Sequence, residues 1–151
     1  MPQSLARIRL HTVFSTKNRH PFLADADIRD QMKAYLGATT KRLGCSPIRI
    51  SFLCDHVHML TTLTRTLAVS GWVKEIKRVT STWMKTCGHS YSPFRWQSGY
   101  GVFSVGLSEI NTVRRYIENQ ETHHRHTTFK DEYRRLLTQH GIAFDERYVW
   151  D

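Results

Sequence analysis

Two histidines, His56 and His58, flank a single apolar residue in the strand-like run from His56 to Leu63. Successive side chains of a β-strand point to opposite faces of the sheet, so both imidazoles should share one face and Val57 should occupy the other. Neutral imidazoles bind divalent metal ions, and a rigid strand holds two of them at a fixed separation. The pair therefore predicts half of a metal site.

The predicted helix from Ser108 to about Glu121 offers the missing groups. Tyr116 and Gln120 are four residues apart, a spacing that puts both side chains on one helix face. The Gln120 carbonyl oxygen is a candidate third ligand. Two imidazoles and an amide leave an ion's charge uncompensated, and such an ion would polarise a phosphodiester oxygen. The pattern indicates attack of Tyr116 on phosphorus, which conserves the energy of the broken bond in a phosphotyrosine.

The charge balance favours a polyanionic partner. The 151-residue chain has 22 Lys and Arg against 13 Asp and Glu, a net charge of +9, and nucleic acid is the first candidate. Residues expected to contact DNA phosphates are Lys74, Lys77, Arg78, Lys85, Arg114 and Arg115. Such contacts would add salt dependence without reading bases. For the four on the Val69–Lys85 helix, an ordinary solvated face is the alternative.

Hydrophobic periodicity predicts a β-α-β-β-α-β order with appended helices. The expected strands are Leu5–Ser15, Pro47–Cys54, His56–Leu63 and Gly101–Val105, and the expected helices are Asp25 or Asp27 to about Leu43, Val69–Lys85, Ser108 to about Glu121, and Phe129–Gln139. This is an α+β, ferredoxin-like (RRM-like) antiparallel sheet with helices on one face, followed by a C-terminal catalytic helix and an appended helix. We expect a single domain over residues 1–151, with the histidine pair near the middle of the sheet.

Several classes of protein are disfavoured. No apolar run approaches the roughly 20 residues that span a bilayer, so no membrane partner is expected. Arg7 and Arg9 stand where a signal peptide needs its apolar centre, which predicts a cytoplasmic protein. Three scattered cysteines without a Cys-x-x-Cys pair argue against a zinc ribbon and a disulfide framework.

Two motifs and four further segments of the chain resemble the single-tyrosine transposases of small insertion sequences. Asp55–Leu60 (Asp-His-Val-His-Met-Leu) resembles their His-hydrophobic-His motif, and Tyr116–Gln120 resembles their catalytic helix. The segments 13–17, 95–105, 120–124 and 146–151 are also similar to that family, so the resemblance covers nearly the whole chain.

The resemblance implies a mechanism. Members of the family act on single-stranded DNA with hairpins near the element's ends, and form a 5′-phosphotyrosine with Mg²⁺ or Mn²⁺. By this likeness Tyr116 is the nucleophile, and His56, His58 and Gln120 are metal ligands. The family also implies a homodimer, in which the tyrosine helix of one subunit can complete the other's site. A domesticated enzyme, or a transposase associated with repetitive extragenic palindromes, is the second choice.

Other interpretations stay open beside these. The two histidines could be metal-free strand residues, and Tyr100 is the next candidate nucleophile. Asp55 could orient a histidine or bind the metal, but it is expected to face away from the histidines, in a turn or structural role. His123, His124 and His126 are expected to face DNA or solvent, because neighbouring positions at a helix end do not converge on one ion. Competing functions are a relaxase or replication initiator, and a non-catalytic single-stranded nucleic-acid-binding module.

Overall fold

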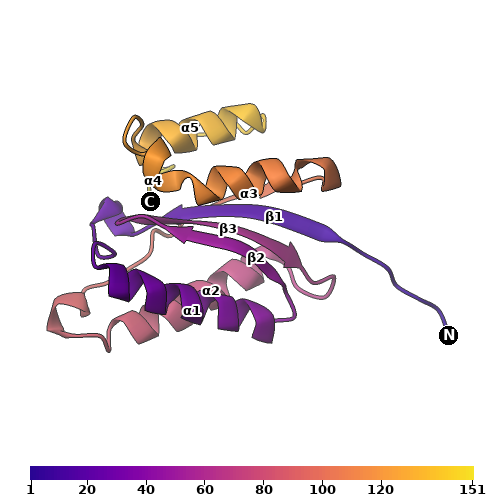
Figure 1. The fold of residues 1–151 in the computed structure, drawn as a ribbon, viewed down its shortest axis with the longest axis horizontal. Coiled ribbons are helices and arrows are strands. Elements are labelled where there is room, and N and C mark those ends of the chain that lie inside the picture. Colours follow the sequence, from indigo (N-terminus) through magenta and orange to yellow (C-terminus); the bar gives the residue numbers. More distant parts are fainter.

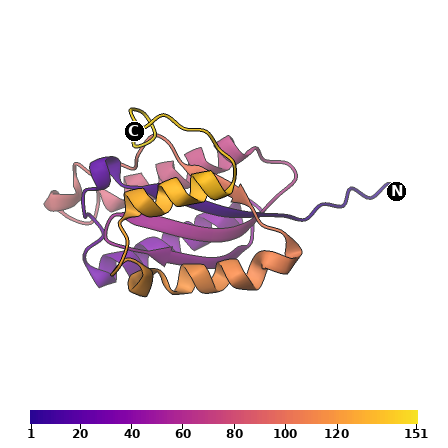
Figure 2. The ribbon, with the colours of Figure 1, turned by 90° about the horizontal axis from the view of Figure 1, so that it is seen from above.

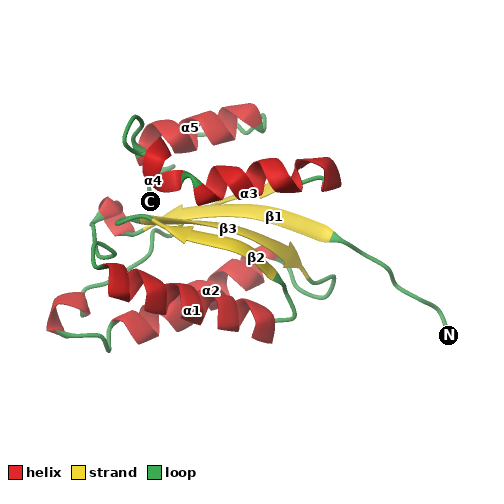
Figure 3. Ribbon diagram, viewed as in Figure 1, coloured by secondary structure: helices red, strands yellow, loops and turns green.

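Four strands form one antiparallel sheet in the spatial order β2-β3-β1-β4. The computed structural model describes residues 1–151. The strands are β1 (Ile8–Ser15), β2 (Pro47–Phe52), β3 (His56–Leu63) and β4 (Gly101–Ser104). The helices are α1 (Ala26–Arg42), α2 (Val69–Met84), α3 (Ile110–Glu118), α4 (Gln120–His123) and α5 (Phe129–Gln139), with short 3-10 turns η1 (Lys17–Arg19), η2 (His89–Tyr91) and η3 (Leu107–Glu109). The predicted ferredoxin-like α+β fold is confirmed (Figures 1 and 3).

Helices cover both faces of this sheet. α1 and α2 pack on one face, and α3, α4 and α5 lie over the other (Figure 1). β3 is buried on both sides: Val57 and Met59 belong to the main core with Trp72, whereas Leu60 packs with Ile117 of α3. Side chains alternate along a strand, so His56 and His58 share the face of Leu60. The histidine pair therefore lies beneath the C-terminal helices.

Most element boundaries match the sequence pattern, and the deviations have local causes. The Asp25 carboxylate accepts hydrogen bonds from the N–H groups of Asp27 and Ile28, which caps α1 as expected. β1 begins at Ile8, where its pairing with Leu63 of β3 begins. The expected continuous helix from Ser108 to Glu121 is wrong, because Asn119 (φ −94°, ψ 17°) leaves the helical conformation between α3 and α4.

The C-terminal segment packs on the domain, as its apolar residues suggest. Phe144, Val149 and Trp150 cover a cluster that includes Phe103 of β4 and Tyr133 of α5. Figure 2 shows α5 lying over the strands, with this segment curling back beyond it. The segment thus fastens α5 over the sheet. None of the helices combines the length and the hydropathy that crossing a bilayer would require.

Candidate active site

Four potential metal ligands meet between β3 and the C-terminal helices. The ligand atoms of His56, His58, His124 and Glu132 all lie within 4.8 Å of one another. Oε1 of Glu132 is 2.9 Å from Nε2 of His58 and 2.9 Å from Nε2 of His124. Nε2 of His56 is 3.7 Å from the same oxygen. Because Glu132 and both strand histidines are almost fully buried, this is an enclosed cluster and not a chance surface grouping.

Both strand histidines are held through their second ring nitrogen. Nδ1 of His56 lies 2.7 Å from Oδ1 of Asp55, and Nδ1 of His58 lies 2.9 Å from Nε2 of His11 on β1. Such outer partners fix ring orientation and tautomer, as they do for metal-bound histidines in general. The two Nε2 atoms are left directed toward the centre of the cluster.

The expectation for the Asp55 side chain was therefore wrong. Asp55 precedes β3, so the strand alternation that predicted an outward direction does not extend to it. Asp55 does lie in a bend between β2 and β3, as expected, and its backbone oxygen accepts a hydrogen bond from the N–H of Thr16 at 2.8 Å. Its carboxylate turns back onto His56. His11 was not foreseen at all, because its approach to His58 depends on the β1–β3 pairing.

Of His123, His124 and His126, which were expected to face DNA or solvent, His124 does not. The side chain of His124 is only 10% exposed and bonds to Glu132. His123 also approaches that carboxylate, with Nε2 3.4 Å from Oε2. The helical-spacing argument fails because α4 ends at His123. The chain then turns, and α5 brings Glu132 to both rings. His126 is exposed.

The Tyr116 hydroxyl donates a hydrogen bond to Oε2 of Glu132. Its ring lies edge-on to His58, with 5.8 Å between centroids. Burial, and then the negative charge of Glu132, raise the pKa of the Tyr116 phenol. Nη2 of Arg135 is 3.4 Å from the phenol oxygen and opposes that shift. The tyrosine and the strand histidines thus meet within one chain.

The ionisation of Glu132 reflects its partners more than its burial. Burial alone would raise the pKa of this carboxyl, but hydrogen bonds from His124, His58 and Tyr116 hold it well below its usual range. Burial lowers the pKa of His58 to about 4, against the opposing effect of Glu132. A carboxylate therefore faces neutral His58 at neutral pH, which is the protonation state that metal binding needs.

Two buried polar atoms in this region have no hydrogen-bond partner. They are Nε2 of His56 and Oε1 of Gln120. Gln120 is fully buried, and its Nε2 donates to the backbone oxygen of Tyr116 at 3.2 Å. Buried polar groups are almost always satisfied, and an imidazole nitrogen and an amide oxygen are both atoms that a divalent cation binds. The donor chemistry of the site therefore fits a divalent cation.

Glu132 is the main residue that the sequence interpretation missed. It lies on the apolar stripe of α5, three residues after Phe129 and four before Leu136, both of which are buried. An acid on a buried stripe needs a partner, since an unpaired buried charge is very costly. This position could therefore have identified Glu132 as a site residue from the sequence. His124 could also have been identified, because it follows Gln120 by four residues and Tyr116 by eight, a spacing that keeps residues on one helix face.

The residues expected to contact DNA are divided between two regions. Lys74 and Arg78 on α2 are exposed, as are Lys85 directly after this helix and Arg115 on α3, whereas Arg114 is half-buried. Lys77 differs from the others on α2. Its ammonium donates to the backbone oxygens of Gln97 and Gly99, both at 2.8 Å, and holds the segment that precedes β4.

Lys77 predicts a measurable pH dependence of stability. Burial lowers the pKa of its ammonium to about 8. Between pH 8 and the unfolded value near 10.5, the unfolded chain binds a proton that the folded chain has released, so stability rises with pH. The pKa difference corresponds to at most about 3 kcal/mol. We expect the free energy of unfolding of the wild type, relative to Lys77→Met, to increase over this range in denaturant titrations. A pH-independent difference would contradict the assignment.

The chain is similar to transposases in its sequence. Residues 4–120 match the family model described as "Transposase IS200 like". Over 122 residues the chain is 24% identical to the ISDra2 transposase TnpA of Deinococcus radiodurans, an alignment that covers 76% of this chain and 84% of that protein. The chain belongs to the family of IS200-like transposases, and it is a transposase.

Two solved structures share the fold. A crystal structure of a Deinococcus radiodurans protein assigned as a transposase has a TM-score of 0.63 at 23% identity and covers 80% of this chain and 95% of that chain. A REP-associated tyrosine transposase bound to a REP hairpin has a TM-score of 0.61 at 15% identity, covering 82% and 73%. The family match ends at Gln120, so His124 and Glu132 lie beyond it.

Proposed function

We propose that this transposase cleaves and rejoins single-stranded DNA with Tyr116 as the nucleophile and a divalent cation as cofactor. The observation that carries the proposal is the hydrogen bond from the Tyr116 hydroxyl to Glu132. The same carboxylate contacts His58 and His124. A nucleophile, a proton acceptor and metal ligands are thereby within reach of one phosphate, which is the arrangement that nucleophilic catalysis requires.

His56 and His58 are the proposed metal ligands on β3, with Gln120 as the third ligand. The geometry adds His124 and Glu132 as further donors, whose ligand atoms lie within 4.8 Å of those of His56 and His58. Three imidazoles and a carboxylate suit Mn²⁺ better than Mg²⁺, which prefers oxygen ligands. When bound, the cation would polarise a non-bridging oxygen of the scissile phosphodiester.

Tyr116 and Glu132 carry the covalent step. The hydroxyl proton passes to the Glu132 carboxylate as the phenol oxygen bonds to phosphorus. The bond from phosphorus to O3′ breaks, and the leaving oxygen takes a proton from solvent. The products are a 5′-phosphotyrosine and a free 3′-OH, and the reverse step joins a different 3′-OH. Because burial and Glu132 raise the pKa of Tyr116, the phenol is protonated at neutral pH, and its proton has to leave as the bond to phosphorus forms.

The proposed substrate is single-stranded DNA whose element ends form hairpins. The REP-associated structural neighbour is bound to a REP hairpin, which supports hairpin recognition and keeps a palindrome-associated role as the alternative. The net charge of +9 is consistent with phosphate contacts. We also propose that the protein forms a homodimer and that it acts on the chromosome in the cytoplasm. Because one chain already brings Tyr116 to the histidines, cleavage within a subunit is the expected mode.

The test is a covalent adduct of defined polarity. The protein is incubated with a hairpin-bearing single strand and Mn²⁺, then run on a denaturing gel, with the DNA labelled at its 5′ end or its 3′ end in separate reactions. Only the 3′ label should travel with the protein, because the tyrosine holds the 5′-phosphate. EDTA should abolish the adduct. A 5′ label on the protein would reverse the proposed polarity, and DNA binding without any adduct would favour the non-catalytic module.

A further inference from the structure

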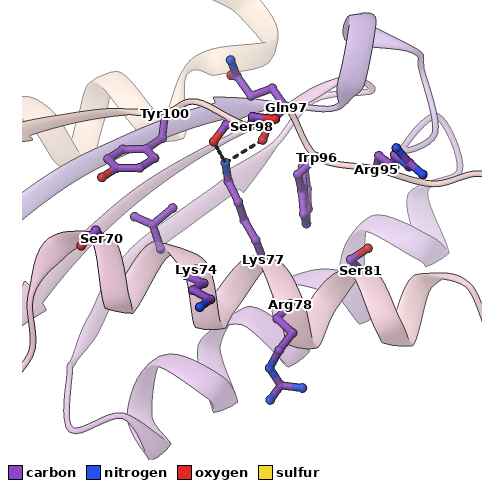
Figure 4. Close-up of a pocket in the computed structure, with 11 residues that line it drawn as sticks. Ser70, Lys74, Lys77, Arg78, Ser81, Arg95, Trp96, Gln97, Ser98 and Tyr100 are labelled. Carbon is purple, nitrogen blue, oxygen red and sulfur yellow. Dashed lines mark hydrogen bonds between the residues drawn. The ribbon is translucent and has the colours of Figure 1, made fainter. Parts of the chain in front are cut away.

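A cavity of about 400 Å³ lies between α2 and the segment that precedes β4. It belongs to the side of the sheet covered by α1 and α2, opposite the side covered by α5 (Figure 1). Figure 4 shows Lys77 rising from α2 to this segment, with Tyr100 on one side and Trp96 on the other. We call it the α2 groove and define it by its basic and aromatic lining residues, which are Lys74, Lys77, Arg78, Arg95, Trp96 and Tyr100. Its volume is in the range that accommodates small ligands.

The charge of the α2 groove is entirely positive. Four of its lining residues are basic and none is acidic. Lys74 and Arg95 are exposed and form no ion pair, whereas Arg78 pairs with Glu75, which lies outside the lining. An exposed pair of this kind contributes little and can exchange for a phosphate. The groove is therefore suited to a ligand with more than one negative charge.

The wall of the groove is preformed. Lys77 holds the backbone oxygens of Gln97 and Gly99, and its ammonium lies 5.6 Å from the Tyr100 ring centroid. Tyr100 is 37% exposed, so part of its ring is open to a ligand. Trp96 is buried against the rings of Phe14 and Phe94, and its Nε1 donates to Thr80 at 3.0 Å. Tyr100 is thus the aromatic surface that remains available for stacking.

The groove is tied to the strand beside the candidate active site. The N–H of Gln97 donates to the Ser15 oxygen at 2.9 Å, and the N–H of Ser15 donates to Oε1 of Gln97 at 2.8 Å. Ser15 is the β1 partner of His56 in the β1–β3 register. A ligand in the α2 groove would therefore lie at the same end of the sheet as His56.

We propose that the α2 groove binds a single-stranded nucleotide segment, with its phosphates on Lys74, Arg78 and Arg95 and one base stacked on Tyr100. Positive grooves that track a backbone, combined with aromatic rings for unstacked bases, are how proteins hold single strands without reading their sequence. A duplex keeps its bases stacked internally and would not use Tyr100. That the nucleic acid is DNA rests on the proposed function, whereas binding of a single strand in the groove does not depend on it.

The test is fluorescence anisotropy with a labelled single-stranded 12-mer that forms no hairpin, and with a duplex of the same sequence. Proteins carry Tyr116→Phe and contain no metal, so the cleavage chemistry is absent. Lys74→Ala with Arg95→Ala should weaken single-strand binding at least about tenfold at low salt and reduce the slope of log K against log salt by about 1.4. Lys41→Ala with Arg65→Ala, which removes two exposed charges outside the groove, is the matched control.

Tyr100→Ala should weaken binding of the single strand about fivefold or more without changing the salt slope, and should leave duplex binding unaltered. Tyr100→Phe should retain wild-type affinity. Equal behaviour of the groove pair and the control pair, or a Tyr100→Ala effect as large on the duplex, would overturn the proposal. Failure of the proposed function gives a different result. If the groove variants weaken single-strand binding as expected but no covalent adduct forms with wild-type protein, the α2 groove is supported and only the cleavage mechanism is contradicted.

Discussion

Replacing Tyr116 with phenylalanine should eliminate the covalent protein–DNA adduct. Phenylalanine keeps the ring that lies edge-on to His58 and His11 but removes the oxygen that must bond to phosphorus. Loss of a nucleophile lowers rates by about a thousandfold or more. The measurement is the adduct yield on denaturing gels over time, with the 3′-labelled hairpin strand and saturating Mn²⁺. Anisotropy with the same DNA should show little change in affinity.

The matched control is Tyr148→Phe, because Tyr148 is 64% exposed and lies in the C-terminal segment. It should form adduct at the wild-type rate. Glu132→Gln should retain the adduct at a rate about 10² to 10⁴ lower, since a positioned proton acceptor contributes that much. Adduct formation by Tyr116→Phe at the wild-type rate would show that another residue is the nucleophile. Peptide analysis of the adduct would then locate the DNA-linked residue, and Tyr100 would be the first candidate.

Removing the His56 imidazole should remove the metal site. We expect calorimetry to show one Mn²⁺ per wild-type chain, and His56→Ala to weaken that binding more than about a hundredfold. Changing the outer partner of a metal ligand already costs 10- to 100-fold, so direct loss of a ligand should exceed it. Asp55→Asn should fall in that smaller range, because Asp55 orients His56 through Nδ1. Mg²⁺ should bind more weakly than Mn²⁺.

An exposed histidine provides the control for this titration. His89→Ala, in η2, should bind Mn²⁺ as the wild type does. The identity of the remaining ligands follows from two more variants. If Gln120 is the third ligand, Gln120→Ala should weaken binding more than His124→Ala, and the opposite order would assign that position to His124. Wild-type affinity in His56→Ala would refute a site at this pair and return His56 and His58 to an ordinary structural role.

Short-range patterns in the sequence predicted the fold and the first residues of the site. A spacing of two on a strand puts His56 and His58 on one face, and a spacing of four near a helix end keeps Tyr116 and Gln120 together. These relations hold whatever packs nearby, because backbone geometry alone sets them. The order of strands and helices followed from hydrophobic periodicity for the same reason, and the observed sheet has the expected antiparallel pairing.

Hydrophobic periodicity cannot predict which residues of distant elements will contact a given face of a strand or helix. Glu132 bonds to His58 across 74 residues of sequence, and His11 reaches His58 across 47. The first contact requires α5 to fold back over the sheet, and the second requires the β1–β3 register. Similarly, His124 turns inward because the helix ends at His123. The sequence by itself determined which side chains share a face; only the packing of distant elements decided that a buried carboxylate joins Tyr116 to the histidines.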